Sequence, residues 1–174
     1  MDGVADMEVE LTPGRIYLAK EKKARAPFDL FIKCQECGRP SMLVTRCHPR
    51  ILKEEHGIEG DDVLWLSMTS GTRNLDPTGL GRISEIMAQH IRESEGAVVL
   101  LDGLEYLASM NEFRRVLGMM DRMYEEATVN KGIFVTTIDP DAFDHREVAF
   151  LERNAICLTE GCLPRWPSQK IINR

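Results

Sequence analysis

Short apolar runs that alternate with helix-length amphipathic segments constrain the fold of this chain more than any other feature. The clearest run is Ala97–Leu101, five apolar residues followed by Asp102. Runs without polar alternation are typical of strands that are covered on both faces, as in parallel sheets packed between helices. We therefore expect a three-layer α/β protein with about five core strands. The strands are predicted at Ser41–Arg46, Val63–Met68, Ala97–Asp102 and Gly132–Ile138, with a small N-terminal strand at Arg15–Ala19.

The segments between these runs have the spacing of helices that bury one face. Asp76-Pro77 predicts a helix start, because Asp is a good N-cap and Pro suits the first helical position. Ser109 and Glu112 have the spacing of a capping box before another helix. The other predicted elements are helices at Phe28–Cys37, Pro49–Gly57, Asn111–Thr128 and Asp141–Asn154, and a closing hairpin of Ala155–Thr159 with Cys162–Trp166 across Glu160-Gly161.

Length and charge limit the domain count and the class of partner. The chain has 174 residues and a formal net charge of −6. We predict one domain at residues 14–166, an acidic leader at 1–13 and a basic tail at 167–174. The acidic balance argues against duplex nucleic acid as a partner. The apolar runs are far shorter than the roughly 20 residues that span a membrane, so no membrane segment is expected. Five cysteines, with no basic segment opening the chain, favour a reducing, cytoplasmic location.

Polar side chains follow each predicted core strand, at the edge of the sheet where open α/β proteins bind ligands. Each of these residues also has a simpler explanation, because a chain turns at a strand end and turns are polar. Taken together they predict a binding edge. The candidate site residues are Thr45, Arg46, His48, Arg50, Ser67, Thr69, Arg73, Asp102, Glu105 and Asp139.

The run Val98–Asp102 has the form of a Walker B strand, in which the terminal carboxylate helps to hold Mg²⁺. A nucleotide-hydrolysing site of this type also needs a glycine-rich Walker A loop with Lys, and no Gly-Lys pair occurs in the chain. The sequence places Thr45–Arg50 where that loop is expected. This argues against ATP hydrolysis of the usual kind, and we do not expect an enzyme.

A weaker anion site remains open at the start of the helix predicted from Pro49. Arg46, His48 and Arg50 lie there, and free backbone N–H groups at a helix N-terminus favour negative charge. The alternative is that Arg46 pairs internally with Asp102 or Asp139 and neutralises the strand ends.

Cys34 and Cys37 have the spacing of one knuckle of a zinc ribbon, and Cys47 and His48 offer further ligands. Structural zinc sites usually show two such pairs, and here only one is present. A redox role needs the pair near a helix N-terminus, whereas these cysteines lie near a predicted helix C-terminus. We favour packing and free thiols, and predict no metal or other cofactor.

Segments spread over about residues 14–152 carry a family resemblance, and the most specific is Asp102–Leu107 together with Asn111. The pattern resembles an archaeal family of domains of unknown function that is similar to KaiC/RecA-like domains and to the MEDS sensory domain. Members of that family are often attached to PAS, receiver or histidine-kinase modules. The other segments are Gly14–Leu18, Gly38–Pro40, Val44–Arg46, Leu64–Ser67 and Asp139–Ala142.

The resemblance implies a RecA-like, P-loop-type domain without a Walker A loop that serves in signalling. It also implies a sheet ordered 5-1-4-3-2, counted from the Ser41 strand. The chain departs from the family in its Cys34–Cys37 pair, and we expect it to stand alone without an attached sensor or kinase module.

Three functions stay open at this point. The first is a non-catalytic signalling module that binds a partner protein, a second copy of the chain or a small anionic ligand at the strand ends. The second is a weak nucleotide-binding protein or hydrolase that uses Arg46, His48, Arg50 and Asp102. The third is a zinc- or thiol-dependent regulator built on Cys34, Cys37, Cys47 and His48.

Overall fold

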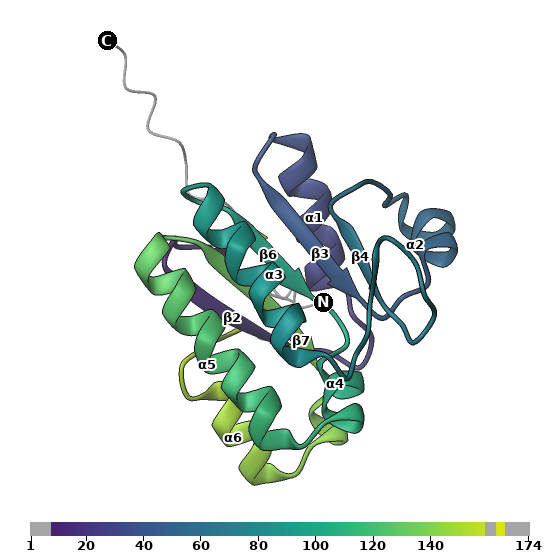
Figure 1. Ribbon diagram of the computed structural model, residues 1–174. Helices are drawn as coiled ribbons and strands as arrows, with labels where there is room; N and C mark the ends of the chain where they lie inside the picture. The colour runs from purple at the N-terminus through teal and green to yellow at the C-terminus, as the bar shows by residue number, and fades with distance from the viewer. Residues whose placement is uncertain (1–7, 159–162, 166–174) are drawn as a thin grey trace, which may run out of the picture.

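Seven parallel strands form the central sheet (Figure 1). The computed structural model describes residues 8–158 and 163–165. Strand β6, which corresponds to the apolar run singled out in the sequence, is the fourth of the seven and therefore the central strand. In spatial order the strands are β5 (Asn74–Leu75), β4 (Val63–Leu66), β3 (Ser41–Thr45), β6 (Val98–Leu101), β7 (Ile133–Ile138), β2 (Arg15–Lys20) and β8 (Ile156–Leu158).

Helices cover both faces of this sheet, as Figure 1 shows. Alternate residues of β6 explain why, since Val98 and Leu100 belong to one apolar core and Val99 and Leu101 to the other. The prediction of a three-layer, RecA-like parallel α/β fold is confirmed. The first core lies under α1 (Ala26–Glu36) and α2 (Pro49–His56), and the second under α3 (Leu80–Glu93), α4 (Leu104–Met110), α5 (Phe113–Asn130) and α6 (His145–Glu152).

The observed strand order differs from the expected order 5-1-4-3-2 in which the Ser41 strand is the first strand. That strand, β3, lies between β4 and β6 rather than beside the last strand. The order 5-1-4-3-2 does appear as β8-β2-β7-β6-β3, with the numbering started at β2 and with β4 and β5 as additions beyond β3. The strand at Arg15–Lys20 is therefore a full member of the sheet between β7 and β8. Its turn into α1, and not the turn after β3, is the first strand-to-helix turn of the sheet.

The expected closing hairpin is wrong. Strand β8 pairs in parallel with β2, whereas β9 (Leu163–Arg165) pairs in parallel with β1 (Glu8–Glu10) in a separate two-stranded sheet. Two consecutive segments can each find a different partner when a longer-range parallel pairing is available. The predicted turn at Glu160-Gly161, residues 1–7 of the leader and the tail at 167–174 lie outside the described residues.

Three predicted helix starts also need correction. Asp76, the predicted N-cap, does not begin a helix. Its side chain accepts from the backbone N–H and the hydroxyl of Thr78 in a local turn, and α3 begins only at Leu80. Ser109 lies inside the unexpected helix α4, and α5 begins at Phe113 without a side-chain cap. The last helix begins at His145, where Asp144 and Glu147 form a capping box.

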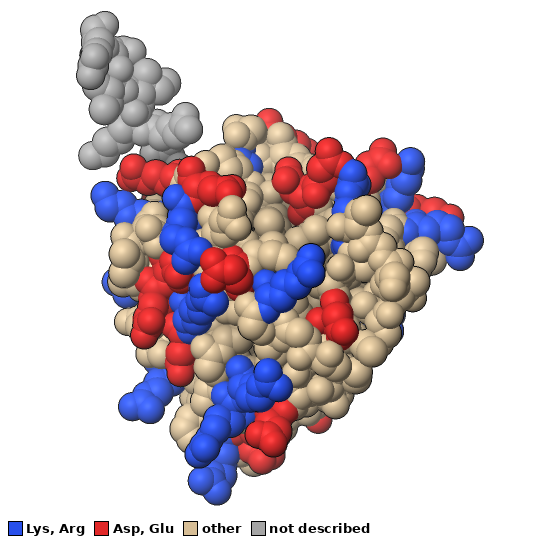
Figure 2. Space-filling view, in the orientation of Figure 1, with Lys and Arg blue, Asp and Glu red and all other residues tan. Residues whose placement is uncertain are grey.

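Charged side chains of both signs are interspersed over the face shown in Figure 2. On α3 and α5 they form a linked group in which Arg92 bonds both Glu85 and Glu126. This face is therefore not a continuous basic surface of the kind that binds duplex nucleic acid. Within the described part of the chain, no helix combines the length and the apolar character that crossing a bilayer requires.

Candidate functional site

The ends of β3 and β6 bring together the first two candidate residues. The hydroxyl of Thr45 donates to Oδ2 of Asp102 at 2.7 Å, and the backbone N–H of Arg46 donates to the carbonyl of Asp102 at 3.2 Å. Burial raises the pKa of Asp102, while hydrogen bonds from Thr45 and the backbone of Arg46 and Cys47 oppose that rise. The negative charge of Glu21 raises it further.

The side chain of Arg46 turns away from these carboxylates. Its guanidinium donates to the carbonyl of Leu66 at 3.1 Å and lies 4.2 Å from the centre of the Tyr106 ring. Among the ion pairs of residues 8–158 there is no pairing of Arg46 with Asp102 or Asp139. The alternative in which this arginine neutralises the strand ends therefore does not occur, and Asp102 is held by neutral donors.

Gly103 makes the close approach of the two strand ends feasible. Its φ of +110° is a conformation that side chains rarely adopt, and a Cβ there would meet the Cβ of Arg46 at 3.0 Å. The chain can thus enter α4 directly after Asp102. This turn carries Glu105 and Tyr106 toward the same edge of the sheet.

A second pair of candidates meets at the end of β7. The backbone N–H of Asp139 donates to Oε1 of Glu105, and Oδ1 of Asp139 accepts from the N–H of Asp141 at 3.0 Å. Burial raises the pKa of Glu105, and the neighbouring charges of Asp102 and Asp139 raise it further. The carboxyl edge of β6 and β7 is therefore an acidic surface in which like charges disfavour full ionisation.

The turn from β2 into α1 adds a residue that the sequence reasoning missed. The carboxylate of Glu21 accepts from the backbone N–H of Arg25 at 3.0 Å and of Ala26 at 3.2 Å, and from the hydroxyl of Thr137 at 2.8 Å. Glu21 thereby accepts from two of the backbone N–H groups at the start of α1. In P-loop proteins the turn between a strand and a helix holds phosphate at such N–H groups. Here the carboxylate of Glu21, a residue of the chain itself, accepts from the N–H groups at that turn.

The remaining candidates lie in local turns or away from this edge. His48 caps α2, because its Nδ1 accepts from the N–H of Arg50 at 3.1 Å. The hydroxyl of Ser67 accepts from the N–H of Thr69 at 3.0 Å. Arg73 extends to the carbonyl of Gly60 and to Asp61, which precede β4, so its guanidinium lies toward the opposite end of that strand.

The three cysteines of the zinc hypothesis lie at opposite ends of β3. Cys34 and Cys37 end α1 before β3 begins, whereas Cys47 follows the end of that strand. Burial raises the pKa of the Cys34 thiol to about 12, so this thiol stays protonated and unreactive at neutral pH. In the part of the chain that the structure describes, no group of three or more His, Cys, Asp or Glu residues is placed to hold a metal ion. The four residues of the zinc hypothesis are therefore not brought together.

A family comparison matches the part of the chain that carries this edge. Residues 20–154 match the model of a family described as a protein of unknown function, DUF835. The chain belongs to this family. The match runs from the last residue of β2 past α6, and so it includes the β2–α1 turn and the ends of β3, β6 and β7. No curated protein matches the chain. The acidic edge and the Glu21 turn thus lie within the part of this chain that matches the DUF835 model.

Proposed function

We propose that this DUF835 domain is a non-catalytic regulatory module of a signalling system that recognises a partner at the carboxyl ends of its strands. The partner is a protein, which includes a second copy of the chain, or a small ligand. The module keeps the RecA-like architecture but replaces phosphate binding with an internal contact.

The Glu21 carboxylate is the single observation that carries this proposal. It accepts the two N–H groups at the start of α1, Arg25 and Ala26, that a phosphate would need in a P-loop protein. A nucleotide phosphate brought to this turn would face a carboxylate instead of free donors. Repulsion between the two anions, added to the loss of the donors, disfavours binding of the nucleotide there.

The surroundings of Asp102 support the same conclusion. In nucleotide hydrolases the carboxylate at the end of the corresponding strand acts together with Mg²⁺ and phosphate. Here Asp102 accepts from the hydroxyl of Thr45, and the negative charge of Glu21 raises the pKa of Asp102. This residue therefore ties β3 to β6 and adds an acidic group to a recognition surface.

The weak-hydrolase alternative makes a different prediction that one assay separates. The purified chain is incubated with ATP and Mg²⁺, and the release of inorganic phosphate is followed in parallel with an Asp102→Asn variant. We expect both proteins to match the protein-free background, because the turn that should hold the phosphates is closed by Glu21.

Phosphate release by the wild-type chain that Asp102→Asn abolishes would overturn the proposal. Glu36→Gln serves as the matched control, since Glu36 is an exposed carboxylate at the far end of α1. Activity that survives equally in Asp102→Asn and Glu36→Gln identifies a contaminating hydrolase and leaves the domain without turnover.

A further inference from the structure

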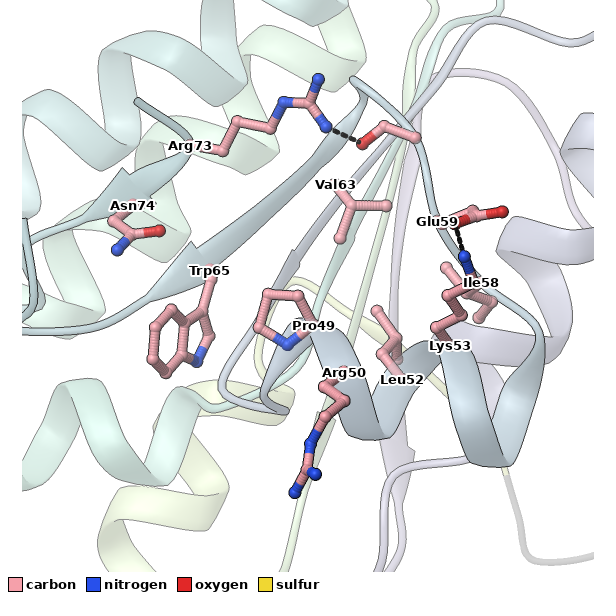
Figure 3. Close-up of a pocket in the computed structure, with 11 residues that line it drawn as sticks. Pro49, Arg50, Leu52, Lys53, Ile58, Glu59, Val63, Trp65, Arg73 and Asn74 are labelled. Atoms are coloured by element: carbon pink, nitrogen blue, oxygen red, sulfur yellow. Dashed lines mark hydrogen bonds and ion pairs between the residues drawn. The ribbon is translucent and has the colours of Figure 1, made fainter. Parts of the chain in front are cut away.

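A groove outside the carboxyl edge lies between α2 and the outer strands β4 and β5 (Figure 3). Its volume is about 290 Å³, near the lower end of the roughly 300–1,000 Å³ that is typical of small-molecule sites. The core residues that line it are Leu52 of α2, Ile58 and Val63 of β4. These side chains are almost entirely covered by protein, so the groove is a depression over the core and not a loose gap.

The indole of Trp65 forms one wall of the groove, as Figure 3 shows. Its Nε1–H donates to the carbonyl of Arg46 at 3.2 Å, and the His48 ring meets it edge-on with 4.7 Å between ring centres. The ring is only partly buried even though it lies within a strand of the sheet. A fixed, partly open indole beside an apolar floor suits stacking against a flat ring.

Cationic side chains from two separate segments surround this apolar surface. Arg50 and Lys53 extend from α2 and Arg73 precedes β5, whereas Glu59 is the one acidic side chain of the lining. Each of these three cations also has a carboxylate within ion-pair distance, which is Glu54 for Arg50, Glu59 for Lys53 and Asp61 for Arg73. The pairs Lys53–Glu59 and Arg73–Asp61 are solvent-exposed. Exposed pairs of this kind contribute little to stability, so a bound anion can displace the carboxylate of Asp61 from Arg73.

From this geometry we infer a binding site for a small, flat aromatic ligand that carries one anionic group. The ring stacks on Trp65 above Leu52 and Val63, and the anionic group bonds the guanidinium of Arg73 in place of Asp61. A carboxylate and a phosphate present the same acceptor geometry to this guanidinium. The inference does not depend on the proposed function, because the groove shares no hydrogen bond with Glu21 or Asp102.

The experiment follows the Trp65 Nε1–H signal by NMR during titration with small probes. Indole-3-acetate and indole-3-acetamide have nearly the same shape and differ in charge, while phenyl phosphate carries a phosphate on an aromatic ring. The signal is assigned by comparison with Trp65→Phe. The contact with Arg73 is solvent-exposed, so its loss weakens binding by up to about fivefold. We expect that weakening for the acetamide, and for Arg73→Gln with the anionic probes.

Arg114→Gln is the matched control, since Arg114 is an exposed arginine of α5 outside the groove. Saturable shifts of the Trp65 signal by indole-3-acetate or phenyl phosphate, weakened by Arg73→Gln and not by Arg114→Gln, support the site and tell which anionic group it prefers. The site is overturned if no probe shifts that signal saturably, if the acetate and acetamide bind equally, or if the two arginine variants behave alike. The backbone amide spectrum of each variant verifies that it is folded.

Discussion

Glu21 is the residue whose replacement tests the β2–α1 turn most directly. Glu21→Ala leaves the N–H groups of Arg25 and Ala26 and the hydroxyl of Thr137 without their acceptor. Loss of a capping acceptor of this kind costs about 0.5–2 kcal/mol, and we expect the free energy of unfolding to fall by that amount. Inorganic phosphate can then bind the freed donors, so it should raise the melting temperature of the variant more than that of the wild type.

Thermal unfolding with and without phosphate, at constant ionic strength, measures this effect. Glu36→Ala is the control, because Glu36 is an exposed residue at the last position of α1, far from the turn. If phosphate raises the melting temperatures of the wild type, Glu21→Ala and Glu36→Ala equally, the turn is not a closed anion position.

The rule that ligands bind at the carboxyl ends of parallel strands predicted some residues of the candidate site and missed others, for physical reasons. It selected Thr45 and Asp102, which do bond each other because parallel neighbours end at one edge. It missed Glu21, because this residue follows β2, which was expected to be a small strand outside the core. Arg73 was expected at the carboxyl edge, but the chain returns from β4 before β5 begins, and the apolar pattern carries no trace of that return.

Strand β6 is the element on which the stability of the sheet depends most. Leu101 is fully buried in this central strand and packs in the core beneath α3 to α6. Truncation at such a site removes apolar contacts and leaves a cavity, so we expect Leu101→Ala to lower the free energy of unfolding by about 2–5 kcal/mol. Urea denaturation measures this loss.

Met68→Ala provides the comparison for that experiment, since Met68 follows β4 and is 61% exposed. Exposed substitutions of this kind usually change stability by about 0.5 kcal/mol or less. A loss for Leu101→Ala as small as the loss for Met68→Ala would contradict the central position of β6.

Strands that contain a run of apolar residues were predicted well. Short elements that depend on the conformation of one turn were predicted poorly. The runs that became β3, β4, β6 and β7 were all identified, because each contains consecutive apolar residues. Helix α4 was missed, since its seven residues follow Asp102 without a polar loop and only the positive φ of Gly103 permits that turn. Short elements that depend on one backbone conformation leave little periodicity in a sequence.

At the scale of the whole molecule, the layers could be predicted and the strand neighbours could not. Alternation of apolar runs and amphipathic segments determines that a parallel sheet lies between helices. It does not say which strand lies beside which, because a parallel crossover can place the next strand at either side. Strand β2 therefore looked like an accessory, although it pairs with β7 along its full length.

The acidic edge gives the whole molecule a pH dependence whose sign follows from Glu105. Its pKa is raised in the folded chain, so the folded state binds this proton more tightly than the unfolded state. Stability therefore falls as the pH rises from the ordinary value of 4.5 through the raised pKa. Glu105→Gln keeps an oxygen acceptor for the N–H of Asp139 but cannot ionise. Relative to the wild type, the variant should gain stability as the pH rises above 4.5.

Urea denaturation of both proteins across this range measures the difference, and Glu85→Gln is the control of opposite sign. Hydrogen bonds from Arg122 and Arg92 lower the pKa of Glu85, so its charge stabilises the folded state above the ordinary pKa and that stabilisation is lost as the pH falls. Glu85→Gln should therefore lose stability relative to the wild type as the pH rises, the reverse of Glu105→Gln. A difference for Glu105→Gln that does not change with pH, or that follows Glu85→Gln, would mean that burial and the charges of Asp102 and Asp139 do not hold the proton on Glu105.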